Sequence, residues 1–209
     1  MIKWVPILLI LVLALGCENS FSTRITSDYF PLKEGNKWIY NVKGENTYQI
    51  EIEVTGIESI QGDSIFLVST GGEIKRFQRK PGTANRMREL FTTCEGEKVS
   101  FGTIYEPYLL LPPIEGENWE KEFRFSSIHH GDTIEKVFSV KIDSVINTTL
   151  VLNSENYKNV YRLKRTIIED NDSLIEYEWF APNIGLLKKE IPSDSTLWEL
   201  ASFTLDEEY

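Results

Sequence analysis

Alternation of apolar and polar side chains at every second residue is the feature that most constrains what this chain can fold into. Tyr48, Ile50, Ile52 and Val54 alternate with Gln49, Glu51 and Glu53. A strand places successive side chains on opposite faces, whereas a helix would scatter these residues around its axis. The pattern therefore predicts an antiparallel strand with one buried face and one face in water.

The same pattern recurs along most of the chain, in roughly a dozen segments with turn residues between them. No segment has the apolar periodicity of an amphipathic helix, so the sequence predicts an all-β antiparallel fold. Between Ile134 and Ile146 the alternation is uneven, which indicates a bulge or a bend. Asn147-Thr148 is interpreted as the turn that follows this segment.

A motif of eight residues, Pro-x-x-Glu-Gly-x-x-Trp, occurs twice. The first copy spans 31–38 and the second spans 112–119, 81 residues later. Glu-Gly followed by a polar residue is typical of a turn, and a strand-like segment follows each copy. We therefore expect one strongly curved sheet or barrel built from two similar halves, about 29–106 and 107–205. No Pro/Gly/Ser-rich linker divides them, so 29–205 is predicted to form a single β-rich domain.

The N-terminus resembles the signal of a bacterial lipoprotein. Lys3 precedes an apolar run of nine residues, 7–15, and Gly16 stands directly before Cys17. The run is shorter than the roughly 20 residues that span a bilayer. We interpret 1–16 as the signal peptide, Cys17 as the site of acyl chains such as palmitate, and the polar segment 17–28 as a tether. Ordinary secretion with cleavage after Gly16 is the alternative, and either way the protein is exported.

The charge balance argues against nucleic acid as a partner. The chain has 22 basic and 32 acidic residues, and removal of Lys3 with the signal peptide changes its net charge from −10 to −11. Such a surface repels phosphate backbones. Acylation of Cys17 would attach the protein to a cell-envelope membrane without help from basic residues. Cys94 then has no partner for a disulfide, and we expect it in a buried or half-buried strand position.

No motif in the sequence indicates an enzymatic mechanism. G-x-S-x-G, H-E-x-x-H, phosphate-loop and dinucleotide fingerprints are all absent from the sequence. His129 and His130 could bind a metal with Asp132, but neighbouring side chains on an extended chain point to opposite faces. We interpret them as turn residues, and the sequence predicts no metal, no cofactor and no catalytic residue.

Five aromatic residues are the most interesting candidates for a binding site: Trp38, Tyr40, Trp119, Trp179 and Phe180. They could line a cavity for a lipid or another apolar ligand, or form a platform on which a sugar stacks. Packing in the interior of a sheet explains them equally well, because aromatic residues at period two are what such an interior needs.

Three motifs give the chain a resemblance to a broad family of uncharacterised bacterial lipoproteins of the Bacteroidota type. They are Tyr29-Phe30-Pro31-Leu32-x-x-Gly35-Asn36-x-Trp38-x-Tyr40, Tyr157-x-Asn159-Val160-Tyr161-x-Leu163 and Trp179-Phe180-Ala181-Pro182-x-Ile184-Gly185-Leu186-Leu187-Lys188. The resemblance implies an anchored, β-rich envelope protein without known catalytic residues.

Two functions remain open on this basis. The first is a non-catalytic binding or carrier module, anchored to the membrane, whose curved sheet holds an apolar small molecule. The second is a structural or interaction subunit of the envelope that contacts other envelope proteins through its acidic surface or a sheet edge. The first requires an apolar cavity, and the second requires protein partners.

Overall fold

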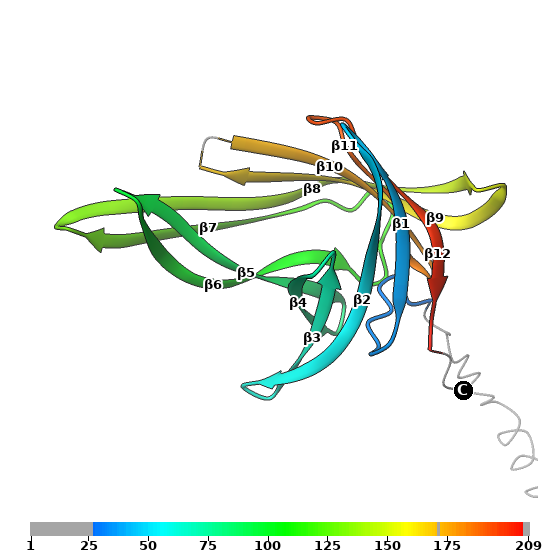
Figure 1. The fold of residues 1–209 in the computed structure, drawn as a ribbon, viewed down its shortest axis with the longest axis horizontal. Helices are drawn as coiled ribbons and strands as arrows, with labels where there is room; N and C mark the ends of the chain where they lie inside the picture. Colours follow the sequence, from blue (N-terminus) through cyan, green and yellow to red (C-terminus); the bar gives the residue numbers. More distant parts are fainter. Residues whose placement is uncertain (1–26, 171, 207–209) are drawn as a thin grey trace, which may run out of the picture.

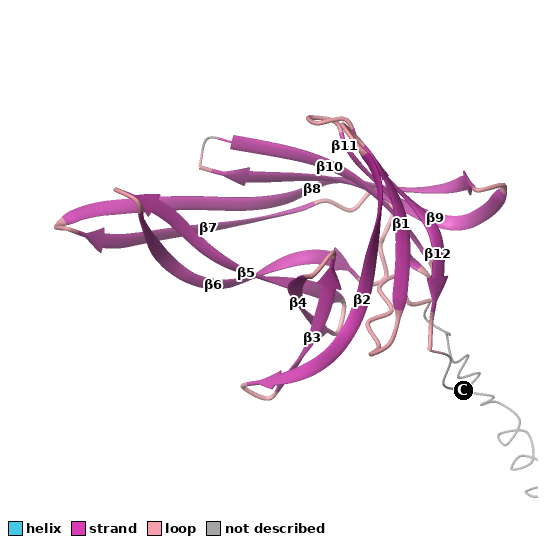
Figure 2. Cartoon of the chain, in the orientation of Figure 1, coloured by secondary structure: helices cyan, strands magenta, loops and turns pink. Residues whose placement is uncertain are grey.

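The computed structural model describes residues 27–170 and 172–206. The predicted signal peptide 1–16, Cys17 and the tether up to residue 26 lie outside the described residues. The described part consists of strands and turns (Figure 2), and it holds no helix long and apolar enough to cross a membrane. Its twelve strands are β1 (Lys37–Lys43), β2 (Thr47–Ile60), β3 (Asp63–Thr70), β4 (Glu73–Lys80), β5 (Thr83–Cys94), β6 (Glu97–Leu110), β7 (Trp119–His129), β8 (Asp132–Leu152), β9 (Glu155–Glu169), β10 (Asp172–Ala181), β11 (Gly185–Ile191) and β12 (Thr196–Thr204).

All twelve strands belong to one antiparallel sheet (Figure 1). Its order is β6-β5-β4-β3-β2-β1-β12-β11-β10-β9-β8-β7, so two meanders of six strands meet where β1 pairs with β12. β6 and β7 are the two edges of the sheet. The predicted all-β, antiparallel, strongly curved sheet of two similar halves is confirmed.

The curvature brings together strands that are distant in the sheet order. Seven strands separate β6 from β10 in that order. Even so, the Tyr108 ring on β6 lies 6.2 Å from the Phe180 ring on β10, edge to face. Both side chains are buried, and so are Val54 and Leu163 from the two different meanders. The core therefore fills the inside of the curve and belongs to both halves.

The repeated motif forms the same turn before the first strand of each half. Gly35 N donates a hydrogen bond to Val54 O, and Gly116 N donates one to Val145 O, both at 2.9 Å. The two glycines have φ angles of +89° and +80°, a left-handed conformation that L side chains rarely adopt. Each turn is thus fastened to the second strand of its own half, β2 or β8.

The prediction of a bulge in the 134–146 segment is confirmed, but the predicted turn at Asn147-Thr148 is wrong. The β8–β9 register shifts between Ile142 and Ser144 and again between Thr148 and Leu150. The ladder passes through Asn147 and Thr148, because both keep partners on β9, and the strand turns only at 153–154. Both residues of that turn have positive φ, at +51° and +68°.

Candidate binding cavity

A cavity of about 100 Å³ lies inside the curve of the sheet, with walls that are mainly apolar. It is bounded by residues of both halves and by the segment that precedes β1. The aromatic side chains on its walls are Phe30, Trp38, Tyr40, Phe77, Tyr108 and Trp198. Phe30, Phe77 and Tyr108 contact one another with ring centroids 5.2 to 5.3 Å apart, which fixes their positions.

Trp38 and Tyr40 enter this wall because they alternate along β1, so both face the inside of the sheet. Trp38 Nε1 donates to Ile184 O and Tyr40 Oη donates to Leu186 O, both at 2.7 Å. The β11–β12 ladder begins only at Lys188, so no β12 residue pairs with the segment that contains Ile184 and Leu186. The two side chains satisfy carbonyl groups there, which is what a buried Trp or Tyr requires.

Charged residues stand behind and beside these rings. Arg165 Nη2 donates to Glu178 Oε2 at 2.8 Å and to Tyr108 O at 2.6 Å. Tyr108 Oη donates to Glu178 Oε1 at 3.0 Å, so both carboxylate oxygens of Glu178 accept hydrogen bonds. Arg165 is fully buried and Glu178 is 1% exposed. Such a pair persists in an interior only because each charge has a partner and hydrogen bonds.

Neighbouring charges keep both members of the Arg165–Glu178 pair ionised. Burial acts to raise the pKa of Glu178, but Arg165 and then Lys189 outweigh burial and hold that pKa low, at about 2. Burial likewise acts to lower the pKa of Arg165, but Glu178 and the other acidic groups around it together outweigh burial, so this pKa is raised. Both groups are therefore ionised at neutral pH.

Cations outnumber carboxylates on the cavity wall. Lys75, Arg86 and Lys189 line it, whereas Glu178 is the one carboxylate among the described residues that do so. Lys189 pairs with Glu176 at 2.6 Å, and Arg86 pairs with a carboxylate behind the wall. Lys75 forms no ion pair with any described residue, and burial lowers its pKa. An anion beside Lys75 would favour its charged form.

The carboxylate behind the wall is Glu106, a fully buried residue of β6. It accepts from Arg88 Nε at 3.0 Å and also pairs with Arg86. One carboxylate thus faces two guanidinium groups inside the sheet, while Glu73 and Glu89 line the groove outside. The positive interior contrasts with the net charge of the whole chain, −10.

A larger groove of about 710 Å³ adjoins this charged end and shares Lys75 and Arg86 with the cavity. It lies where β4 and β5 separate, because their ladder ends at Arg76 and Met87. β5 continues with β6 alone as far as Cys94, which is half-buried as predicted. The groove therefore gives the charged end of the cavity access to solvent.

Two of the five predicted aromatic residues line the cavity. These are Trp38 and Tyr40; Phe180 packs behind Tyr108 and does not line it. Trp179 is buried, with Lys188 Nζ 4.9 Å from its ring centroid. Trp119, half-buried on the edge strand β7, packs against the core away from the cavity. Contact of any of the five with a ligand stays a prediction.

The charged residues of the cavity were missed by the sequence analysis. A signal exists for Arg165, which has the same strand parity as the apolar residues Leu163 and Ile167. All three are buried. An arginine at an inward-facing position requires a buried partner, which points to an internal carboxylate. The sequence pattern identifies neither Glu178 as that partner nor Lys75 as the cation without one.

The three motifs behind the family resemblance meet in space beside the cavity. The Tyr29 ring of the first motif lies 5.3 Å from the Tyr161 ring of the second, and its hydroxyl donates to Asn159 O at 3.2 Å. Trp38 and Tyr40 of the first motif donate to carbonyl groups of the third. Gly185, with φ +97°, lets the third motif approach Pro31 closely. These motifs therefore fasten the N-terminal segment to the sheet.

The comparisons with known proteins give two similar solved structures. No family model matches the chain, and no curated protein matches it. A candidate lipoprotein from Parabacteroides distasonis is 12% identical, with 85% of this chain and 99% of that chain covered and a TM-score of 0.49. A candidate exported protein with a YmcC-like fold from Bacteroides fragilis is also 12% identical, with 86% and 100% covered and a TM-score of 0.47. At this level of similarity, neither protein identifies a family or a ligand for this chain.

Proposed function

We propose that this chain is an exported, membrane-anchored binding protein of the cell envelope that takes a compact amphipathic acid into its cavity. The observation that carries the proposal is the composition of the cavity wall, where aromatic rings stand together with one carboxylate and three cations. One of these cations, Lys75, has no ion-pair partner among the described residues. Apolar walls with a few convergent polar groups are typical of ligand sites. Acylation of Cys17 supplies the anchor in this proposal.

The size of the cavity limits the ligand. A cavity of roughly 150 Å³ accommodates benzene, and this one measures about 100 Å³. With small shifts of its walls it takes an aromatic ring or a short branched chain, and a long acyl chain is too large. The carboxylate of such a ligand would lie against Lys75 and Arg86, where the cavity meets the groove. The small volume and the two cations together narrow the predicted apolar ligand to compact monocarboxylates.

The proposal assigns a binding role and not a catalytic one. A general acid or base works best with a pKa near the operating pH. Glu178, the carboxylate on the wall, has a pKa of about 2 and both oxygens occupied by Arg165 and Tyr108. It is suited to holding Arg165 in place and unsuited to proton transfer.

Calorimetric titration of the full chain in detergent with phenylacetate tests the proposal, with decanoate as the long-chain comparison. We expect saturable binding of phenylacetate and at least about tenfold weaker binding in Lys75→Met, because a charge-assisted contact worth roughly 1.5–3 kcal/mol is lost. Lys80→Met is the matched control, since Lys80 is an exposed lysine of the same strand that pairs with Asp63 outside the cavity. It should bind like the wild type.

Two outcomes would overturn this proposal. One is absence of saturable phenylacetate binding, and the other is equal affinity in Lys75→Met and the wild type. Decanoate binding that exceeds phenylacetate binding would contradict the size limit. A negative result would favour the other open role, contact with envelope proteins.

A further inference from the structure

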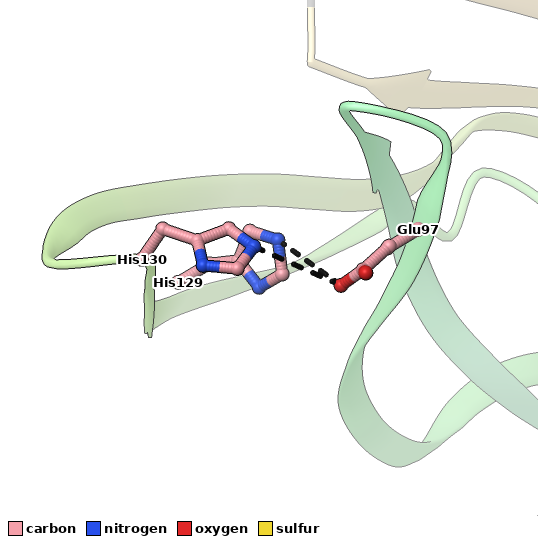
Figure 3. A group of neighbouring side chains, drawn as sticks. All are labelled: Glu97, His129 and His130. Carbon is pink, nitrogen blue, oxygen red and sulfur yellow. Dashed lines mark ion pairs between the residues drawn. The ribbon is translucent and has the colours of Figure 1, made fainter.

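The open edges of the sheet meet at the tips of two hairpins. β6 and β7 are the edge strands, and no ladder joins them within the described residues. Glu97 is the first residue of β6, directly after the β5–β6 turn, and His129 is the last residue of β7, directly before the β7–β8 turn. Figure 3 shows both imidazoles, of His129 and His130, pointing from one hairpin tip toward the Glu97 carboxylate on the other.

The geometry of these three side chains is that of a converging ligand set. Glu97 Oε2 lies 3.6 Å from His129 Nε2 and 3.8 Å from His130 Nε2. One ligand atom from each residue falls within 4.8 Å of the others. The two imidazole centroids are 4.1 Å apart. Three groups from two hairpins thus point at one small volume.

The sequence-based expectation that the two histidines point to opposite faces is wrong for this turn. It assumed an extended chain, and His130 has a φ angle of +51°, in the left-handed region. Gly131 follows with φ +91°, so the pair forms the two-residue turn of a hairpin. This backbone rotation brings the His130 ring to the same side as the His129 ring.

The separations suit a metal ion better than they suit direct contact. At 3.6 and 3.8 Å the nitrogen–oxygen distances are too long for hydrogen bonds. His129 Nε2 is buried and has no hydrogen-bond partner within 27–170 and 172–206. Zinc binds imidazole nitrogen and carboxylate oxygen at about 2.0–2.2 Å, and a tetrahedron with such bonds has edges of roughly 3.4 Å. The two nitrogen–oxygen separations exceed that spacing by only a few tenths of an ångström, and one ligand atom from each residue lies within 4.8 Å of the others.

We propose that Glu97, His129 and His130 bind a divalent transition-metal ion of the zinc class, with water as the fourth ligand. Imidazole ligands favour zinc and its neighbours over magnesium or calcium, which prefer oxygen ligands. The ion links the β5–β6 hairpin to the β7–β8 hairpin and closes the sheet at the edges where no ladder does so. The site is separate from the cavity, and each proposal stands or falls without the other.

Titration of the metal-free full chain, prepared without a polyhistidine tag, with zinc chloride tests the site. We expect one ion per chain in the wild type, and affinity at least about tenfold lower in Glu97→Gln and in His130→Gln. Glu97 and His130 have side chains 66% and 63% exposed, so neither variant disturbs the core. The matched control is Glu95→Gln, which removes a carboxylate from the same turn but outside the ligand set. It should bind zinc like the wild type.

Hydrogen exchange gives a readout specific to the closure of the sheet. Zinc should slow hydrogen exchange in segments 91–101 and 125–135 of the wild type and of Glu95→Gln. In His130→Gln the exchange rates of these segments should be the same with and without zinc. No stoichiometric binding, or undiminished affinity in both ligand variants, would overturn the site. Stoichiometric binding without slower exchange at the two tips would overturn the link between the hairpins. Lys75→Met should keep wild-type zinc affinity, which separates this result from the test of the cavity.

Discussion

At the scale of single residues, Arg165 and Glu178 form an ion pair that is buried inside the sheet. Each would be very unfavourable alone in this interior, because the transfer of a charge out of water has a penalty of several kcal/mol. They bond to each other and to Tyr108, whose ring also lies 4.3 Å from the Arg165 guanidinium carbon, while Arg165 Nη1 has no hydrogen-bond partner among the described residues. The pair thus joins β9 and β10 to β6 from inside the sheet.

Replacement of one partner of this pair should destabilise the protein more than replacement of both. Arg165→Met leaves Glu178 charged and buried, and we expect the free energy of unfolding to fall by about 3–5 kcal/mol. In the double variant with Glu178→Met no charge is stranded, so its stability should lie closer to that of the wild type. Urea denaturation of the full chain and its variants measures this. A double variant less stable than Arg165→Met alone would contradict the expected coupling.

The repeated motif acts at the scale of a turn and the strand after it. In both copies a glycine with positive φ donates its N–H to the second strand of its half. The environments then differ, because β1 lies in the middle of the sheet and β7 at its edge. Trp38 is accordingly buried, while Trp119 is half-buried. The sequence repeat therefore fixes equivalent turns but not equivalent surroundings for the two tryptophans.

Gly35→Ala and Gly116→Ala should destabilise the protein by similar amounts, about 1–2 kcal/mol each. A Cβ at either position meets no atom of the described part of the chain within 4 Å, so backbone strain at positive φ is the dominant effect. Gly56→Ala is the control, since its φ is not positive and its Cβ would make ordinary contact with Leu67. Thermal and urea unfolding should place this control within about 0.5 kcal/mol of wild type. Two unequal losses at Gly35 and Gly116 would show that the turns are not equivalent.

At the scale of the whole molecule, β12 joins the two halves. It pairs with β1 on one side and with β11 on the other. Leu200 of β12 is 2% exposed and lies opposite Tyr40 of β1. Its packing therefore belongs to both meanders, although almost the full length of the domain separates β12 from β1 in sequence. A substitution that weakens the contact between β12 and β1 should therefore make both halves unfold together.

Leu200→Ala should lower the free energy of unfolding by about 2–5 kcal/mol in one cooperative transition. Phe203→Ala is the control on the same strand, because Phe203 is 41% exposed, and we expect a loss below about 1 kcal/mol. Circular dichroism and tryptophan fluorescence should report the same midpoint. Two separate transitions, only one of them shifted, would contradict the prediction that 29–205 is a single domain.

Much of the fold follows from local rules that can be applied to the sequence. Period-two alternation determines that the segments are strands, and turn residues separate most of them, since both depend on near neighbours in the chain. The uneven alternation in the 134–146 segment correctly indicated a bulge. The turn predicted at Asn147-Thr148 failed because turn propensity is weak where a long partner strand, here β9, continues the ladder.

The candidate sites depend on contacts between residues that are far apart in the chain. Lys75 and Glu178 line one cavity because the sheet curves until β4 faces β10, and curvature depends on the twist and packing of all the strands. Glu97 meets His129 and His130 because two hairpin tips from different halves end at the same place. The strands and the repeated turns can be predicted from the sequence because they depend on near neighbours in the chain. The juxtaposition of charges that are distant in the chain depends on the whole sheet.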